Sequence, residues 1–241
     1  MSQTTRKHTT TLAGEEVTYE VSRSDDATQP RIDAGIDGIT VVLPASLDED
    51  PETVLMENAG WVLEKKTKFD QYRADIPDRT FEAGEQFPYL GEEHELIIEP
   101  PQKSEVVDET IRLRQSAVGQ SSVERALRNF YRREAREYLS ERLDLFAGGM
   151  ELDYDGVQIR NQRTRWGSCS TNGTISLNWR LLMAPPEVID YVVVHELAHL
   201  REPNHTDAFW SLVAEYIPEY EAHEDWLEEN STRLVFSADD L

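Results

Sequence analysis

The segment that most constrains the fold is a short apolar run carrying two histidines and a glutamate. Within Tyr191–Leu200, the pattern His-Glu-x-x-His places His195 and His199 four positions apart. If the run is a helix, both imidazoles leave the same face about one turn apart and can bind one metal ion. Glu196 is rotated by roughly 100° from His195, which suits a group that acts beside the metal.

The neighbouring side chains predict that this helix is buried. It is apolar on most sides because of Val192–Val194, Leu197, Ala198 and Leu200. Imidazoles and a carboxylate inside such a helix need partners. The ordinary alternative, two solvated histidines on a surface helix, therefore fits the pattern less well.

A catalytic zinc site needs a further ligand, because zinc there binds three side chains and one water. Pro203 ends the helix, since it lacks an N–H group and biases its predecessor away from helical geometry. The chain then turns through Asn204 towards His205. Glu215 and Glu219, from a following helix, are the other candidates for the third ligand.

The composition indicates a globular, strongly acidic protein. The chain has 241 residues, 39% of them hydrophobic, and a formal net charge of −23. Five of the 24 basic residues are lysines. Such a surface repels nucleic acid and anionic membranes at long range, and it resembles that of salt-adapted, halophile-like proteins.

The N-terminal residues and the cysteine count favour a cytoplasmic protein. No secretory signal is visible after Met1, and no apolar run approaches the length of a membrane span. Cys169 is the single cysteine, which excludes an intrachain disulfide and fits a reducing compartment. We read it as a small buried thiol rather than a nucleophile.

The N-terminal part reads as β-rich with one helix. Strands are expected over 16–22 and 38–44, joined as a hairpin or meander. A helix with Asp50 as its cap and Pro51 in its first turn is expected to reach about Lys66, with Trp61 on its packing stripe. A hairpin about Gly91 and a strand over 110–114 should follow. No internal repeat is visible in the sequence.

A long helix over 122–146 carries the main concentration of basic residues. Ser121 or Ser122 caps it, and Gly148-Gly149 should follow its end. Five arginines occupy one face: Arg125, Arg128, Arg132, Arg133 and Arg136. The ordinary interpretation is pairing with nearby carboxylates. The alternative is contact with nucleic acid or an anionic substrate, against which the chain's acidity argues.

The C-terminal part alternates strands and helices around the histidine helix. A strand begins at Val157, and Asn172-Gly173 predicts a hairpin leading into Thr174–Trp179. Thr206 should cap a further helix that breaks at Pro218. The expected fold class is α+β, with a β-rich N-terminal region over 1–112 and a catalytic domain over 113–241 made of helices and a small mixed sheet.

Three stretches, one of them the histidine helix, together match the sequence pattern of a known protein family. They are Arg165-Trp-Gly-Ser-Cys169, Ser176-Leu-Asn-Trp-Arg180, and Asp190–Leu200 continued by Asn204-His-x-x-x-Phe-Trp210. The sequence resembles the YgjP-type metal-dependent hydrolases, zincin-like proteins grouped near the WLM and SprT peptidases. The resemblance is specific from about Val157 to Trp210 and looser over the N-terminal strands.

The resemblance implies a zinc-dependent hydrolase with a zincin-like fold, acting on peptide or protein substrates. It implies His195, His199 and His205 as Zn²⁺ ligands and Glu196 as the general base for a metal-activated water. It also places the segment from Arg165 to Cys169 near the active site. The related WLM and SprT enzymes act on proteins attached to DNA.

Several residues around this centre receive weaker roles. Arg165 is a candidate oxyanion donor, Trp166 and Trp179 line the cleft or pack in the core, and Asp190 orients the helix or bonds a ligand. Strand 174–178, ending at Asn178, offers its backbone to an extended peptide.

Two other function classes fit the same residues. One is a non-enzymatic, zinc-stabilised module that binds protein or nucleic acid through the Arg-rich helix. The other is hydrolysis of a non-peptide amide, for which zinc and a glutamate serve equally well.

Overall fold

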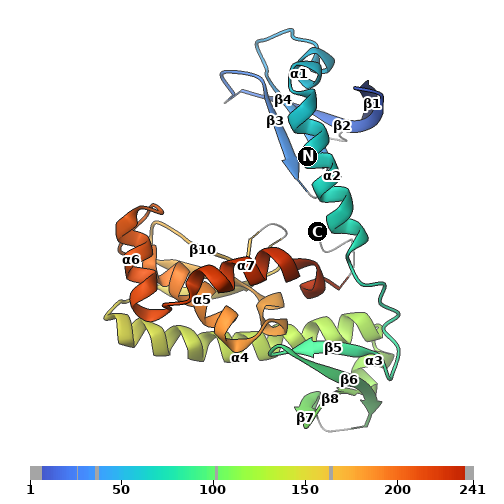
Figure 1. The fold of residues 1–241 in the computed structure, drawn as a ribbon. Coiled ribbons are helices and arrows are strands. Elements are labelled where there is room, and N and C mark those ends of the chain that lie inside the picture. Colours follow the sequence, from blue (N-terminus) through green and yellow to red (C-terminus); the bar gives the residue numbers. More distant parts are fainter. Residues whose placement is uncertain (1–6, 26, 36–37, 101–102, 163–164, 237–241) are drawn as a thin grey trace. The chain divides into compact units, whose positions relative to one another are not determined.

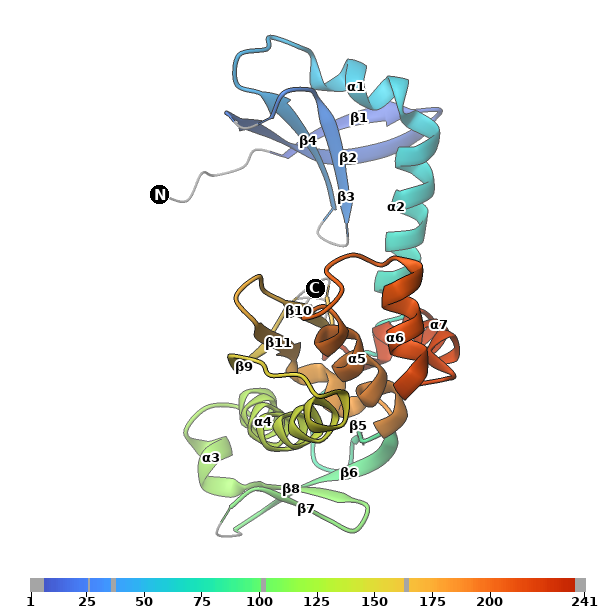
Figure 2. The same cartoon turned by 90° about the vertical axis from the view of Figure 1, so that its left-hand side faces the viewer.

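The computed structural model describes residues 7–25, 27–35, 38–100, 103–162 and 165–236. These residues form a mixed α+β structure with a β-rich N-terminal part (Figures 1 and 2). The chain divides into two compact units, and the boundary lies between Ile76 and Pro77. Each has its own hydrophobic core, the smaller around Val17, Val41 and Leu55 and the larger around Leu139, Val193 and Leu197.

The first unit contains a four-stranded sheet of order β1-β2-β4-β3. Its strands are β1 (Lys7–Leu12), β2 (Glu15–Ser24), β3 (Arg31–Gly35) and β4 (Gly38–Pro44). The two expected strands are present, but β2 and β4 run parallel. The prediction of a hairpin or meander between them was wrong, because the intervening β3 pairs with the other edge of β4 and reverses the chain once more.

Two helices replace the single helix expected after Asp50. The Asp50 side chain accepts a hydrogen bond from the Glu52 N–H at 3.1 Å, which confirms the cap, and α1 spans Pro51–Glu57. Asn58 interrupts the helix, since its side chain donates to the Val54 carbonyl at 2.8 Å, and α2 spans Ala59–Ala74. Trp61, expected to pack, is 43% exposed, whereas the adjacent Val62 is buried.

A second four-stranded sheet repeats the topology of the first. It consists of β5 (Gln86–Tyr89), β6 (Glu92–Glu99), β7 (Glu105–Val107) and β8 (Thr110–Arg114), in the order β5-β6-β8-β7. The central pair is again parallel and the outer pairs antiparallel. The sequence did not reveal this repeat, because the shared local signal is little more than a Gly-Glu-Glu turn at Gly14 and at Gly91.

The turn between β5 and β6 fixes the chain just ahead of the histidine helix. Leu90 and Gly91 have φ angles of 50° and 86°, and their N–H groups donate to the carbonyls of Leu182 and Met183 at 2.8 and 3.3 Å. A Cβ at Gly91 would lie 3.0 Å from the Pro185 Cα. This sheet therefore belongs to the second compact unit, where it supports the short 3-10 helix η1 (Trp179–Met183).

After α3 (Gln115–Gly119), the long helix α4 (Val123–Met150) forms one side of the larger core. Ser122 caps it, with its hydroxyl accepting from the Arg125 N–H at 3.2 Å. The prediction that it ends before Gly148-Gly149 was wrong, because the helix continues to Met150. Ala147 and Met150 are buried, so core packing outweighs the low helix propensity of the glycines.

A three-stranded sheet of order β10-β11-β9 lies beside α4 and the helix α5 (Pro186–Ala198). It contains β9 (Gly156–Arg160), β10 (Gly167–Cys169) and β11 (Thr174–Asn178). The predicted hairpin is confirmed, with Gly173 at φ 80° and β10 antiparallel to β11. Because β11 pairs on its other side with β9, it has no free edge for a peptide. Strand addition at 174–178 is therefore wrong, and β10 is the edge strand on that side.

Four helical segments complete the second unit. They are α5 (Pro186–Ala198), α6 (Asp207–Tyr216), α7 (Tyr220–Asn230) and η2 (Ser231–Leu234). The break at Pro218 between α6 and α7 is confirmed. Thr206 precedes α6 with an extended backbone, but its side chain makes no capping hydrogen bond. Among the residues described, no helix combines the length and apolarity that crossing a membrane requires.

Candidate metal centre

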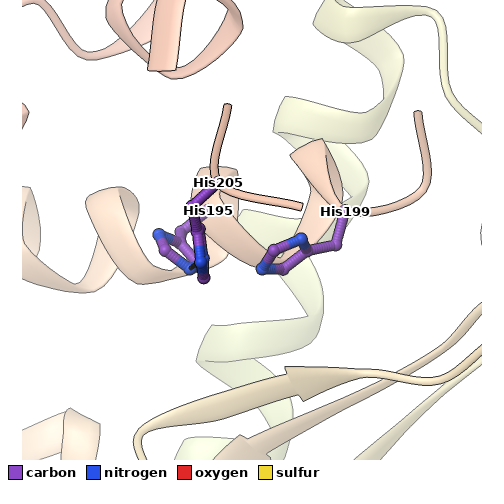
Figure 3. Close-up of side chains that lie close together, drawn as sticks. All are labelled: His195, His199 and His205. Carbon is purple, nitrogen blue, oxygen red and sulfur yellow. Dashed lines mark hydrogen bonds between the residues drawn. The ribbon is translucent and has the colours of Figure 1, made fainter. Parts of the chain in front are cut away.

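Helix α5 presents two histidines from the middle of the core. It starts at Pro186, whose missing N–H costs nothing in a first turn, and most of its residues up to Ala198 are buried. His195 lies in its last turn and His199 at its C-terminal cap. The chain then bends back, and His205 points towards the other two rings (Figure 3).

The three imidazoles are spaced as ligands of one ion. One nitrogen from each of His195, His199 and His205 lies within 4.8 Å of the others. The Nε2 atoms of His195 and His205 are 3.1 Å apart. Two nitrogens bound to tetrahedral zinc at 2.0–2.1 Å would be about 3.3 Å apart, so the spacing of His195 and His205 fits this ion. Neither Glu215 nor Glu219 joins the cluster found within the described ranges.

One aromatic side chain forms a common wall for the three rings. The Phe209 ring centroid lies 4.9, 4.6 and 4.7 Å from those of His195, His199 and His205. Trp210 stacks on His205 with an interplanar angle of 23°, and Tyr220 stacks on the indole at 5.0 Å. Helix α6 thus limits the orientation of His205, although that side chain is exposed.

The protonation of the histidines suits metal binding. Burial, with smaller effects from the neighbouring imidazoles, lowers the pKa of His195 to about 3. Burial also lowers the pKa of His199. The Nδ1 of His199 lies 3.2 Å from the Glu202 carbonyl, a contact that assigns its proton to Nδ1 and leaves Nε2 with a lone pair.

Glu196 lies beside the histidines as a buried carboxyl group. It is 6% exposed, and its Oε2 has no hydrogen-bond partner. Burial raises its pKa to about 7, while the charge of Arg165 and a backbone hydrogen bond from Cys169 act in the opposite direction. A carboxyl group whose pKa lies near 7 can accept and release a proton at physiological pH.

A glycine leaves the room that this carboxyl group occupies. A Cβ at Gly167 in β10 would lie 2.5 Å from both Cγ and Oε1 of Glu196. Any larger side chain at 167 would therefore displace the carboxylate. Sequence reasoning missed this contact; the available signal was the glycine inside the Trp-Gly-Ser-Cys segment.

In the metal-free protein, the burial of Glu196 should make the free energy of unfolding depend on pH. Its folded pKa of about 7 exceeds the reference value of 4.5. This group thus contributes stability below pH 4.5 that is lost as the pH rises through 7. In metal-free protein at about pH 8, Glu196→Gln should raise the unfolding free energy by on the order of 3 kcal/mol. Urea unfolding measures this difference. If the two proteins differed in unfolding free energy by the same amount at about pH 4 as at pH 8, the raised pKa of Glu196 would be contradicted.

The other predicted site residues divide between the site and its scaffold. Asp190 forms a bidentate ion pair with Arg142 of α4, with both N–O distances at 2.6 Å, so it links α5 to α4 and orients α5. Asn178 is fully buried, and its amide donates to the carbonyls of Gln162 and Arg165 at 2.8 and 3.1 Å. Both residues hold segments next to the site in place: Asp190 holds α5, and Asn178 holds the chain before β10.

The remaining candidates lie along the segment before β10. Arg165 is exposed, and its positive charge acts to lower the pKa of Glu196. Trp166 is half-buried with the Arg180 guanidinium 5.8 Å from its ring centroid. Trp179 is a core residue, whose indole N–H donates to Asn161 at 2.7 Å. Cys169 is only half-buried, so the prediction of a buried thiol was wrong, but partial burial still raises the pKa of this thiol, in keeping with a thiol that is not a nucleophile.

Three imidazoles on a helix and the bend after it, next to a buried carboxyl group, define a candidate metal centre of the hydrolase class. Comparison with known proteins agrees with this class. Residues 29–230 match the model of the family described as YgjP-like, metallopeptidase domain. The chain belongs to this family of metal-dependent peptidases.

Two solved structures resemble part of the chain. The metallopeptidase zymogen abylysin of Pyrococcus abyssi is 26% identical, with a TM-score of 0.36 over 38% of this chain and 93% of that one. The metallopeptidase zymogen jannalysin of Methanocaldococcus jannaschii is 19% identical, with a TM-score of 0.34 over 39% and 94%. No curated protein matches the sequence.

Proposed function

We propose that this protein is a zinc-dependent metallopeptidase with a zincin-like catalytic unit within residues 113–241. The observation that carries the proposal is the convergence of three imidazoles next to the buried carboxyl group of Glu196. Structural zinc sites are closed by four protein ligands, whereas catalytic sites use three. The three-residue cluster found among the described residues supports the catalytic type over the zinc-stabilised binding module.

In this proposal, His195, His199 and His205 hold the ion, and Glu196 moves protons. Zinc, when bound, supplies a Lewis acid that polarises the peptide carbonyl and lowers the pKa of water. Glu196 accepts the proton of the attacking water and passes it to the departing amine. Arg165 provides a positive charge next to this carboxylate, and the burial of Glu196 keeps its proton affinity high.

The edge of β10 is the proposed binding site for the substrate backbone. Its outer edge pairs with no strand that the structure describes, while its other edge pairs with β11. An extended peptide that adds to this edge passes Gly167 and hence Glu196. This arrangement favours a polypeptide substrate over a small amide, because a strand edge recognises repeated backbone groups.

Zinc content and its removal test the proposal. The purified protein should bind one zinc ion per chain and cleave an unfolded protein substrate. A chelator should abolish cleavage, and added zinc should restore it. His205→Ala should weaken zinc binding strongly, because one of three ligands is lost. His223→Ala, a histidine outside the cluster, is the matched control and should retain zinc. Full zinc affinity in His205→Ala would assign the third ligand elsewhere.

A further inference from the structure

A polar pocket lies beside the β10-β11-β9 sheet, apart from the metal centre. It has a volume of about 620 Å³. Its lining consists of Ile159 and six polar side chains, those of Arg132, Arg160, Asn161, Gln162, Ser168 and Ser176. We refer to it as the Arg132–Arg160 pocket. It is distinct from the three histidines, none of which lines it.

The lining has a charge opposite to that of the protein. It contains two guanidinium groups and no carboxylate, although the chain has 47 acidic and 24 basic residues. Both arginines are exposed, and neither forms an ion pair with any residue in the described ranges. Arg160 donates a hydrogen bond to the neutral side chain of Gln158. Their positive charge is therefore available to an anionic ligand.

One short strand borders both this pocket and the metal centre. Gly167 of β10 faces Glu196, and successive residues of a strand point to opposite faces of a sheet. Ser168 therefore points away from Glu196. It pairs across the sheet with Ser176, and both line the pocket. Gln162 continues the same polar surface and donates to the Ser168 hydroxyl at 3.3 Å.

We propose that the Arg132–Arg160 pocket binds the carboxylate of an acidic side chain of the polypeptide substrate, a proposal that rests on the peptidase function given above. A peptide paired with the edge of β10 directs alternate side chains to the Ser168 face, where the guanidinium groups can bind a carboxylate with paired hydrogen bonds. Arg132 and Arg160 then set a preference for Asp or Glu near the scissile bond.

The lining favours a carboxylate over nucleic acid. Sites for single-stranded nucleic acid combine basic grooves with aromatic side chains that stack on bases. No aromatic residue lines this pocket, and the net charge of −23 repels a polyanion as long as nucleic acid. A single carboxylate held at short range is less affected by that repulsion, because salt screens charges beyond about 10 Å.

A binding measurement that needs no turnover tests the pocket. In full-length Glu196→Gln protein, fluorescence anisotropy compares a labelled glutamine-rich peptide that carries one glutamate with the same peptide in which glutamine replaces that glutamate. The peptide with the glutamate should bind at least about tenfold more tightly. Adding Arg160→Gln or Arg132→Gln should reduce this ratio to near one. Arg136→Gln, which removes the same charge one turn along α4 and outside the pocket lining, should preserve it.

The opposite results would overturn the proposal. These are equal binding of the two peptides, a ratio that survives Arg160→Gln, or an equal loss in Arg136→Gln, which would indicate long-range charge rather than the pocket. Tighter binding of a labelled single-stranded oligonucleotide that depends on Arg132 and Arg160 would assign the pocket to phosphate. Absence of cleavage of any peptide by wild-type protein would count against the peptidase function, while the binding ratio would still decide the pocket.

Discussion

Glu196→Gln is expected to abolish peptide cleavage while the protein keeps its zinc. The amide has nearly the size of the carboxylate but cannot accept the proton, so kcat/KM should fall by about 10²–10⁴-fold, the usual contribution of a general base. Metal analysis and a peptide cleavage assay on the same preparation measure both quantities. The three histidines remain in place, which separates this variant from a loss of metal.

The control for this variant lies on the same helix. Glu187 is exposed in the first turn of α5, and Glu187→Gln makes the same chemical change far along the helix from the histidines. It should retain wild-type cleavage. If Glu196→Gln also retained cleavage, the base would have to be another group, and the role given to the raised pKa of Glu196 would be wrong.

Gly167→Ala should have the second large effect, through displacement of Glu196. The added Cβ would lie 2.5 Å from Cγ and Oε1 and 2.7 Å from Cδ of that residue, so the carboxylate must move. A shift of about 1 Å in a catalytic group costs roughly 10²-fold in rate. We therefore expect kcat to fall by about that factor in an assay with zinc-loaded protein, with zinc content unchanged.

Gly156→Ala provides the matched control in strand β9 of the same sheet. A Cβ at Gly156 meets no atom within 4 Å, so this variant should cleave peptides at the wild-type rate. Equal activity of the two variants would show that the Glu196 side chain tolerates displacement, and would remove Gly167 from the machinery of the site.

Sequence reasoning succeeded where a structural feature depends on a few adjacent residues. The caps at Asp50 and Ser122 each need one side chain that accepts a nearby N–H, and the hairpin at Asn172-Gly173 needs a residue that accepts a positive φ. The apolar residues around His195 likewise predicted a buried helix, which α5 confirms.

It failed where distant parts of the chain decide the outcome. Nothing local to β2 and β4 distinguishes a parallel from an antiparallel pair; the position of β3 does. The end of α4 depends on the burial of Ala147 and Met150, which outweighs the glycines before Met150. Long-range packing of this kind has no signature in a short window of sequence.

The same distinction applies to the site. The spacing within α5 predicted the shared face of His195 and His199 from helix geometry alone. Asp190 was placed on the correct helix, but its partner Arg142 lies on α4, which a single sequence cannot indicate. Gly167 escaped notice for the same reason, because its importance comes from the distance to Glu196 on another element.

A crystal structure of the zinc-loaded protein tests the central claim most directly. The account predicts one zinc ion bound by nitrogens of His195, His199 and His205 at about 2.0–2.1 Å, with the fourth position held by water or another exchangeable ligand. A zinc ion closed by a fourth protein side chain, or a His205 ring turned away from the ion, would contradict it.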